Sequence, residues 1–187
     1  MNRHASVAPL FGRPFYFLRH GETEYNAQGR IAGSYETMLT ERGHEQARFA
    51  AALLAKTTIT HLYTSPMKRA LDTARYVADA VGLPIRAIAD ITERHWGSLE
   101  GQSRSARQPG VTPADAETLD AFTQRVLRGF AEVRGDAPLV VAHSGVFRVL
   151  CRRLGIVEQE RPITNALPLY FEPMDTGWRM APLGLVR

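Results

Sequence analysis

The chain has 187 residues, of which 44% are apolar and 22% are charged, and its formal net charge is +4 at pH 7. An apolar fraction of this size excludes an intrinsically disordered chain, and the length predicts one compact domain. All but two of the 23 basic residues are arginines. The planar guanidinium group matches phosphate and carboxylate oxygens, so anionic partners are worth considering, although a compositional bias accounts for most of these arginines.

The single cysteine, Cys151, limits the sites and compartments that suit the chain. It cannot form an internal disulfide, which predicts a reducing compartment, and it excludes a cysteine-based zinc site. The longest apolar run near the N-terminus spans residues 15–18, which is too short for a signal sequence or a membrane span. We therefore expect a cytoplasmic protein without membrane association.

Short apolar runs alternate with amphipathic segments along the chain. Residues 1–13 lack periodicity and are predicted to be a flexible lead-in to a single domain that spans residues 14–187. Strands are expected at 15–18, 59–63, 85–91, 138–142, 167–171 and 178–180, helices at 40–56, 66–81, 115–134 and 146–154, and mostly loop at 93–113. This alternation predicts an α/β fold, a three-layer α/β/α sandwich with a mainly parallel central sheet.

Two of the predicted strands end in a histidine. Arg19 and His20 follow the first strand, and His143 follows the strand at 138–142. If both strands are parallel and central, the two imidazoles lie at the same edge of the sheet, where open parallel sheets bind ligands. Arg69, in the first turn of a predicted helix, faces that edge, and Glu93 reaches it from the end of another strand.

This set of side chains suits phosphoryl transfer. Arginines and one histidine can neutralise phosphoryl oxygens, a neutral imidazole can attack phosphorus in line, and a carboxylic acid can protonate the departing oxygen. The nearby arginine charges are expected to lower the pKa of His20 and keep it neutral at pH 7. The start of the 66–81 helix adds N–H groups that favour an anion.

Five sequence blocks follow one another between about residues 14 and 155. They are Phe17-Leu18-Arg19-His20-Gly21-Glu22-Thr23 with Tyr25-Asn26, Leu39-Thr40-Glu41-Arg42-Gly43 with Gln46-Ala47, Tyr63-Thr64-Ser65-Pro66 with Arg69-Ala70 and Thr73-Ala74, Glu93 with Gly97 and Glu100-Gly101, and Val141-Ala142-His143-Ser144-Gly145. Arg-His-Gly alone is a weak signal, because so short a motif arises by chance. Together and in this order, the blocks resemble the histidine phosphatase superfamily, the phosphoglycerate-mutase-like proteins.

The resemblance implies a role for each matching position. It makes His20 the nucleophile that forms a phosphohistidine and Glu93 the general acid. Arg19, Arg69 and His143 would bind the phosphoryl oxygens. In the second half-reaction the Glu93 carboxylate would activate water. No metal or other cofactor is expected, because the arginines and an imidazolium neutralise the charge.

Four more residues belong to this comparison. Asn26 matches a phosphate-binding position of the family, and a turn with the residues that follow it is the alternative explanation. Ser144 lies where a backbone or hydroxyl contact with phosphate is expected. Glu22 and Glu100 are the alternatives to Glu93 as the acid, and Glu100 is better explained as a residue that orders the loop.

The short segment between Gly101 and Asp115 favours a phosphatase over a mutase. Phosphoglycerate mutases have a longer insertion here, with a lysine and an arginine pair that bind the substrate carboxylate, and Arg104 and Arg107 do not reproduce that pattern. A shorter lid suits hydrolysis, because water must reach the phosphoenzyme. We therefore predict a phosphomonoester hydrolase that acts on a small phosphorylated metabolite, with a cofactor-dependent phosphoglycerate mutase as the alternative.

A third hypothesis is a non-catalytic domain that binds anions or nucleic acid, prompted by a pI near 9.6. The basic residues are scattered and no interleaved aromatic pattern marks a base-stacking surface, so no nucleic-acid partner is expected. The sequence leaves open the physiological substrate and the choice between a monomer and a homodimer.

Overall fold

The structure, a computed structural model, describes residues 10–157 and 163–184. A six-stranded sheet with the order β3-β2-β4-β1-β5-β6 forms its centre. The strands are β1 (Phe15–Arg19), β2 (His61–Thr64), β3 (Ile85–Ala87), β4 (Pro138–Ala142), β5 (Pro168–Pro173) and β6 (Trp178–Pro182). The first four pair in parallel, whereas β5 is antiparallel to both β1 and β6. The predicted mainly parallel sheet is confirmed.

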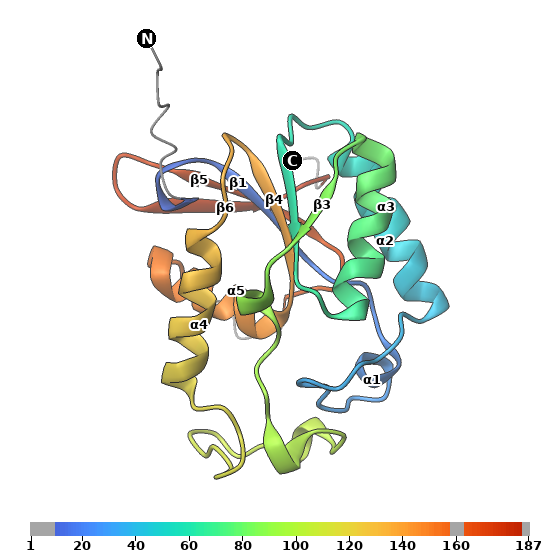
Figure 1. Ribbon diagram of the computed structural model, residues 1–187, viewed down its shortest axis with the longest axis vertical. Coiled ribbons are helices and arrows are strands. Elements are labelled where there is room, and N and C mark those ends of the chain that lie inside the picture. The colour runs from blue at the N-terminus through green and yellow to red at the C-terminus, as the bar shows by residue number, and fades with distance from the viewer. Residues whose placement is uncertain (1–9, 158–162, 185–187) are drawn as a thin grey trace.

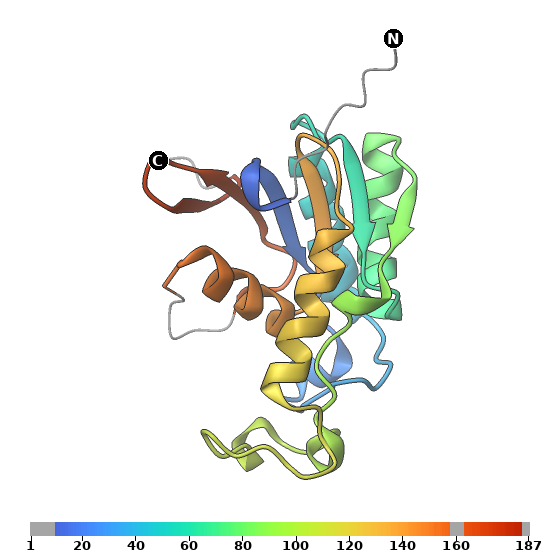
Figure 2. The same ribbon diagram turned by 60° about the vertical axis from the view of Figure 1, so that its left-hand side comes forward.

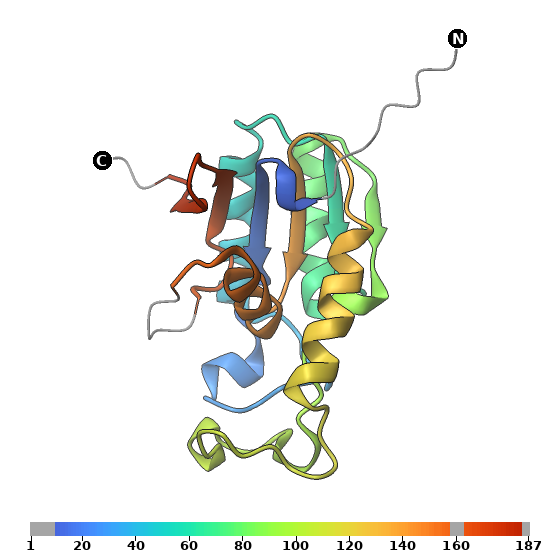
Figure 3. The same cartoon turned by 90° about the vertical axis from the view of Figure 1, so that its left-hand side faces the viewer.

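Helices cover both faces of this sheet (Figure 1). They are α2 (Glu41–Leu54) and α3 (Lys68–Val81) on one face, and α4 (Leu119–Ala131) and α5 (Ser144–Leu154) on the other. Figures 2 and 3 show the two pairs separated by the strands. The structure therefore confirms the predicted three-layer α/β/α sandwich.

Alternation of side chains along β1 explains why both faces need a cover. Phe15 and Phe17 belong to the apolar cluster beneath α4 and α5, whereas Tyr16 and Leu18 belong to the cluster beneath α2 and α3. The residues of β4 divide between the two clusters in the same way. A strand buried on both faces has a continuous apolar run rather than an alternating one, which is the pattern that the sequence shows.

Local signals set several helix ends. Thr40 caps α2, and its Oγ1 accepts a hydrogen bond from the N–H of Gly43 at 3.0 Å. Gly82 ends α3 and Gly155 ends α5, both with a left-handed backbone (φ 70° and 67°) that glycine adopts without strain.

Several predicted boundaries are wrong. The strand expected at 85–91 stops at Ala87, and a 3₁₀ helix, η2 (Ala89–Ile91), follows it. Ile88 and Ile91 are both buried three residues apart, a spacing that suits a helical turn better than a strand. α4 begins only at Leu119, because the Thr118 side chain caps the helix there.

The starts of two other helices also differ from prediction. α3 begins at Lys68 rather than at Pro66, with Met67 in the N-cap position. α5 begins directly after His143, two residues earlier than predicted. A short helix, α1 (Glu24–Ala27), was not predicted from the sequence. The stretch predicted as mostly loop contains two 3₁₀ turns, η3 (Gly97–Leu99) and η4 (Arg104–Ala106).

Residues 1–9 lie outside the described residues, so the predicted lead-in can be followed only from Leu10. Leu10–Gly12 form a 3₁₀ turn, η1, and the Phe11 ring lies edge-on to Phe130 with 6.0 Å between the ring centroids. The described chain thus contacts the core before residue 14, where we expected the domain to begin. No helix of the described residues is long and apolar enough to cross a membrane.

One end of the sheet carries the connections that matter for function. β1 and β4 both point toward the end from which the segment between η2 and α4 projects, and α1 lies at the same end (Figure 1). This end holds the carboxyl termini of the parallel strands, which is the usual place for a binding site in an open α/β sheet.

Candidate active site

The parallel register of β1 and β4 places His20 next to His143. Arg19 lies opposite Ala142, and the N–H of His20 donates to the Ala142 carbonyl at 3.0 Å. The next residue in each chain segment is a histidine, and the two ring centroids are 5.3 Å apart. Both side chains are buried, with exposed fractions of 4% for His20 and 0% for His143.

The tautomer of His20 follows from its partner. Its Nδ1 lies 2.7 Å from the carbonyl oxygen of Gly21. Because a carbonyl can only accept, Nδ1 carries the hydrogen and Nε2 keeps a lone pair. Burial, followed by the positive charges of Arg69 and Arg19, lowers the pKa of His20 well below its ordinary value. The imidazole is therefore neutral at pH 7 and has a nucleophilic nitrogen.

Whereas His20 is held through Nδ1, His143 is held through its Nε2 atom. Its Nε2 lies 2.8 Å from Ser65 Oγ, whereas its buried Nδ1 has no hydrogen-bond partner among the described residues. Burial, followed by the positive charge of Arg69, lowers its pKa well below the ordinary value. A buried polar atom without a partner is costly in a folded protein, and a bound anion would supply one for Nδ1.

Two buried arginines complete the inner site. Arg69 is 1% exposed and donates to the carbonyls of Gly33 and Tyr35, each at 2.8 Å. Arg19 donates to the Ile163 carbonyl at 2.6 Å, and its Nε lacks a partner among the described residues. Burial lowers the pKa of Arg19 to about 10, so the group remains charged at pH 7. Backbone carbonyls thus hold both guanidinium groups without neutralising them.

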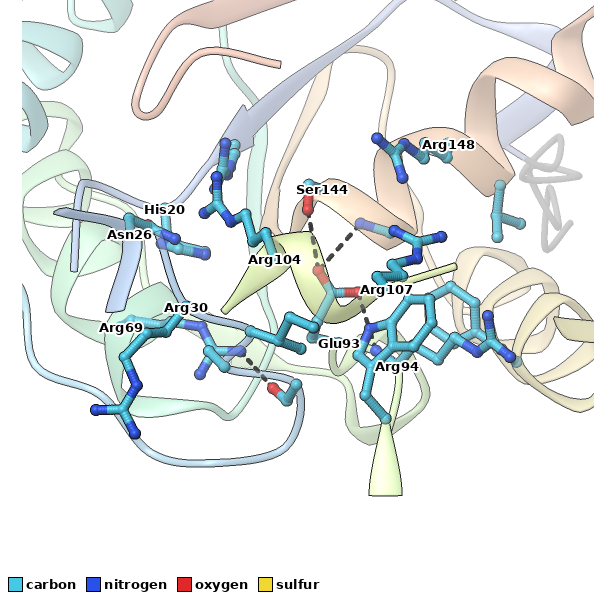
Figure 4. Close-up of a pocket in the computed structure, with 18 of the residues that line it drawn as sticks. His20, Asn26, Arg30, Arg69, Glu93, Arg94, Arg104, Arg107, Ser144 and Arg148 are labelled. Carbon is cyan, nitrogen blue, oxygen red and sulfur yellow. Dashed lines mark hydrogen bonds between the residues drawn. The ribbon is translucent and has the colours of Figure 1, made fainter. Parts of the chain in front are cut away.

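The carboxylate of Glu93 is bound at the start of α5. Its Oε2 accepts hydrogen bonds from the N–H of Gly145 at 3.0 Å and from Ser144 Oγ at 3.3 Å. Its Oε1 accepts from the N–H of Arg94 at 2.9 Å. Figure 4 shows these contacts in the centre of the cavity. The first N–H groups of a helix lack partners within the helix, so the first turn of α5 suits a carboxylate.

The other two candidate acids lie elsewhere. Glu22 accepts a hydrogen bond from Thr40 Oγ1 at 3.0 Å, away from the cavity. Glu100 is buried and accepts hydrogen bonds from the N–H of Ser34 at 2.7 Å and from the N–H of Trp96 at 2.8 Å. It joins two loops, as expected for a residue that orders them. Among the described residues that line the cavity, Glu93 is the only acidic one.

A cavity of about 260 Å³ opens beside these groups (Figure 4), and the fully buried His143 is not among the residues that line it. It is lined by His20, Glu93 and Ser144, and by eight arginines that include Arg19 and Arg69. In the described ranges, no group of three or more His, Cys, Asp or Glu side chains is arranged to hold a metal ion. The cavity is therefore strongly cationic around a single carboxylate.

The family model of the histidine phosphatase superfamily (branch 1) matches residues 15–178. The chain belongs to this superfamily. It is 31% identical over 173 residues to the uncharacterized phosphatase PhoE of Bacillus subtilis, covering 87% of this chain and 90% of that protein. It is 33% identical over 146 residues to the probable phosphoglycerate mutase GpmB of Enterobacter sp. strain 638, covering 68% of each.

Solved structures agree with this assignment. The mycobacterial glucosyl-3-phosphoglycerate phosphatase, in complex with VO3, aligns with a TM-score of 0.76 at 26% identity, covering 91% of this chain and 98% of that one. The resemblance to the histidine phosphatase superfamily that we identified in the sequence is confirmed.

In this member of the histidine phosphatase superfamily, Asn165 is a residue that sequence reasoning missed. Its Nδ2 donates to the His20 carbonyl at 2.9 Å and to Asn26 Oδ1 at 3.0 Å. The carbonyl of Asn26 accepts a hydrogen bond from the N–H of Gly29 at 3.1 Å, so Asn26 forms the predicted turn and also lines the cavity. No motif surrounds Asn165 in the sequence, and only the fold brings it to the end of β1.

Most of the arginines that line the cavity were also not predicted as site residues from the sequence. Besides Arg19 and Arg69, six arginines line the cavity, namely Arg30, Arg94, Arg104, Arg107, Arg148 and Arg152. They come from loops and from α5, which have no shared spacing in the sequence. In a chain so rich in arginine, composition gave no means of separating them from surface residues.

Proposed function

We propose that the protein is a phosphomonoester hydrolase that acts on a small phosphorylated molecule through a phosphohistidine on His20. The observation that carries this proposal is the hydrogen bond from His20 Nδ1 to the Gly21 carbonyl, which leaves Nε2 as a neutral nucleophile between two buried arginines. The names of phosphatase relatives support the same reaction class.

In the first step, His20 Nε2 attacks the phosphorus atom. The bond between phosphorus and the ester oxygen breaks, and Glu93, which enters this step protonated, gives its proton to the departing oxygen and becomes a carboxylate. Arg19, Arg69 and the unpartnered Nδ1 of His143 bind the phosphoryl oxygens. These groups are fixed before the substrate arrives, so they stabilise the transition state without reorganisation.

In the second step, water attacks the phosphohistidine. The Glu93 carboxylate takes a proton from the water, the phosphorus–nitrogen bond breaks, and His20 returns to its neutral form with inorganic phosphate as the product. One carboxyl group thus serves as acid and then as base. Ser144 and Gly145 hold it in place through both steps.

Hydrolysis of p-nitrophenyl phosphate tests the proposal. We expect activity that persists in EDTA, is inhibited by vanadate, and falls on the order of 10³-fold or more in His20→Ala, because the nucleophile is lost. His44→Ala is the matched control, since His44 bonds Tyr76 outside the cavity. Quenching in alkaline detergent, in which the phosphorus–nitrogen bond is stable, should trap a phosphoenzyme in the wild type and none in His20→Ala. Full activity in His20→Ala would overturn the proposal.

A phosphoglycerate mutase remains the second candidate because of the relative named GpmB. Incubation with 3-phosphoglycerate separates the two reactions. Release of inorganic phosphate supports the hydrolase, whereas 2-phosphoglycerate with little free phosphate supports the mutase.

We also propose the cytoplasm as the compartment, since the single buried thiol of Cys151 suits reducing conditions.

A further inference from the structure

The outer part of the cavity is formed by a segment that carries Arg104 and Arg107. This segment is tied to the loop before it in the chain, because the N–H of Arg104 donates to the Gly29 carbonyl and the N–H of Ile31 donates to the Gln102 carbonyl, each at 2.8 Å. Both arginine side chains line the cavity. In Figure 4, Arg104 lies between His20 and Glu93, and Arg107 lies beyond Glu93.

Stacking fixes the guanidinium group of Arg107. Its central carbon lies 4.1 Å from the centroid of the Trp96 ring, and that of Arg94 lies 4.3 Å from the same centroid. Arg94 donates hydrogen bonds to the Glu117 carbonyl and to Thr112 Oγ1. Arg107 makes no such hydrogen bond to the described residues, so its contact with Trp96 is what orients its plane at the cavity wall.

The charges of this outer group are not balanced by the described residues. Neither Arg104 nor Arg107 forms an ion pair with an acidic side chain of the described ranges. Burial, followed by the charge of Arg148, lowers the pKa of Arg107, and the charge of Arg104 helps to lower the pKa of Arg19. Like charges are therefore close enough to repel one another, and an anion between them would relieve the repulsion.

One phosphoryl group does not account for this charge. A phosphate monoester carries about −1.5 to −2 at pH 7, which Arg19 and Arg69 already match in the inner site. Arg104 and Arg107, which are exposed at the cavity, are therefore available to bind a second negative group on the same molecule. Guanidinium groups bind carboxylate and phosphate with the same paired donors, so both anions suit them.

We propose that Arg104 and Arg107 form a second anion subsite, and that the preferred substrates are phosphomonoesters with a further carboxylate or phosphate group. The inference rests on the proposed function, since it assigns the inner site to the phosphoryl group that is removed. It also gives a role to two arginines that do not reproduce the substrate-binding pattern of the phosphoglycerate mutases.

Two matched pairs of compounds test the subsite. The first is 3-phosphoglycerate against glycerol 3-phosphate, which differ by a carboxylate, and the second is fructose 1,6-bisphosphate against fructose 6-phosphate, which differ by a phosphate. We expect kcat/KM to be about 10- to 100-fold higher for the doubly anionic member of at least one pair, mainly through KM. The pair with the larger ratio identifies the anion.

The double variant Arg104→Gln/Arg107→Gln should bring that ratio close to one. Arg86→Gln is the control, because Arg86 is exposed on β3 outside the cavity and loses the same charge. If the ratio is near one in the wild type, or is the same in the wild type and the double variant, the subsite is wrong.

Binding to His20→Ala, measured by calorimetry with the same pairs, makes the comparison without turnover. Tighter binding of the doubly anionic compound, lost when Arg104→Gln and Arg107→Gln are added, supports the subsite even if no ester is hydrolysed. Hydrolysis of p-nitrophenyl phosphate that depends on His20, together with equal binding within both pairs, overturns the subsite and leaves the proposed hydrolase standing.

Discussion

The N–H of Gly145 donates a hydrogen bond to Glu93 Oε2 across 3.0 Å. This bond joins the segment after η2 to the first turn of α5, which begins directly after His143. The same helix start therefore positions the proposed acid and follows one of the two histidines of the site. The carboxylate of Glu93 is thus held by a backbone N–H group, which is more rigid than a donor on a flexible side chain.

Replacing Gly145 with alanine tests this relationship. A Cβ atom at Gly145 would lie 2.1 Å from Glu93 Oε1 and 3.1 Å from the Phe122 ring, so the carboxylate must move. Gly145 lies in a helix, where alanine is well tolerated by the backbone. We expect kcat for alkyl phosphates to fall by about 10- to 100-fold, a part of what a general acid contributes. Steady-state kinetics and a urea unfolding curve measure the two effects separately.

The control for this variant is Gly12→Ala, because a Cβ atom there meets nothing within 4 Å. It should leave kcat at the wild-type value. An unchanged kcat in Gly145→Ala would mean that the position of the Glu93 carboxylate does not limit turnover.

Replacing Glu93 with glutamine separates its two proposed roles. The amide keeps the shape of the side chain and cannot transfer a proton, so turnover of alkyl phosphates should fall by about 10²- to 10⁴-fold. p-Nitrophenolate leaves without protonation, so the first step with p-nitrophenyl phosphate should be affected less than the second. Stopped-flow measurement should show a burst of p-nitrophenolate followed by slow turnover as the phosphoenzyme accumulates.

Glu22→Gln serves as the comparison, since Glu22 was an alternative acid and lies outside the cavity. It should show neither a burst nor a loss of rate. Loss of turnover in Glu22→Gln, with normal turnover in Glu93→Gln, would transfer the acid role to Glu22.

The inner site was largely predictable because β1 and β4 have simple patterns. Their continuous apolar runs mark central strands, and the parallel register then brings His20 beside His143 without any information on loops. The position of Glu93 was predictable only in part. It reaches the site after a 3₁₀ turn rather than at the end of a strand, because a helical turn buries both Ile88 and Ile91.

The outer cavity was not predictable, because long-range contacts shape it. The segment after Glu93 is held by the hydrogen bond that Arg94 donates to the Glu117 carbonyl and by the hydrogen bond that Glu100 accepts from Ser34, 66 residues away. Such contacts leave no periodic trace in the sequence. The placement of Arg104 and Arg107 in the cavity therefore emerged only from the fold.

Removing the Glu100 carboxylate should affect both stability and phosphate binding. In Glu100→Ala the N–H groups of Ser34 and Trp96 lose a charged acceptor, and the loop whose carbonyls bind Arg69 loses its anchor. We expect the free energy of unfolding to fall by about 2–4 kcal/mol and KM for p-nitrophenyl phosphate to rise. Glu100→Gln keeps one acceptor oxygen and should recover part of both. A loss of stability with an unchanged KM would show that Arg69 is positioned without Glu100.

The two buried histidines should make stability depend on pH between about 5 and 7. Burial lowers the pKa of both His20 and His143, so in this window the unfolded chain binds protons that the folded chain does not. The free energy of unfolding therefore falls as pH drops below about 6.5, the ordinary histidine pKa, by as much as about 1.4 kcal/mol per pH unit for each histidine. It is unaffected by these groups above pH 7.

The variant His143→Gln isolates this contribution, because other titrating groups affect both proteins equally. Urea unfolding at several pH values in a phosphate-free buffer should give a slope that is smaller than that of the wild type by about 1.4 kcal/mol per pH unit at most. Measurement at pH 8, where both imidazoles are neutral in either state, gives the cost of the substitution itself. Parallel curves for the two proteins between pH 5 and 7 would mean that His143 takes up a proton in the folded state as readily as in the unfolded chain, contrary to its burial beside Arg69.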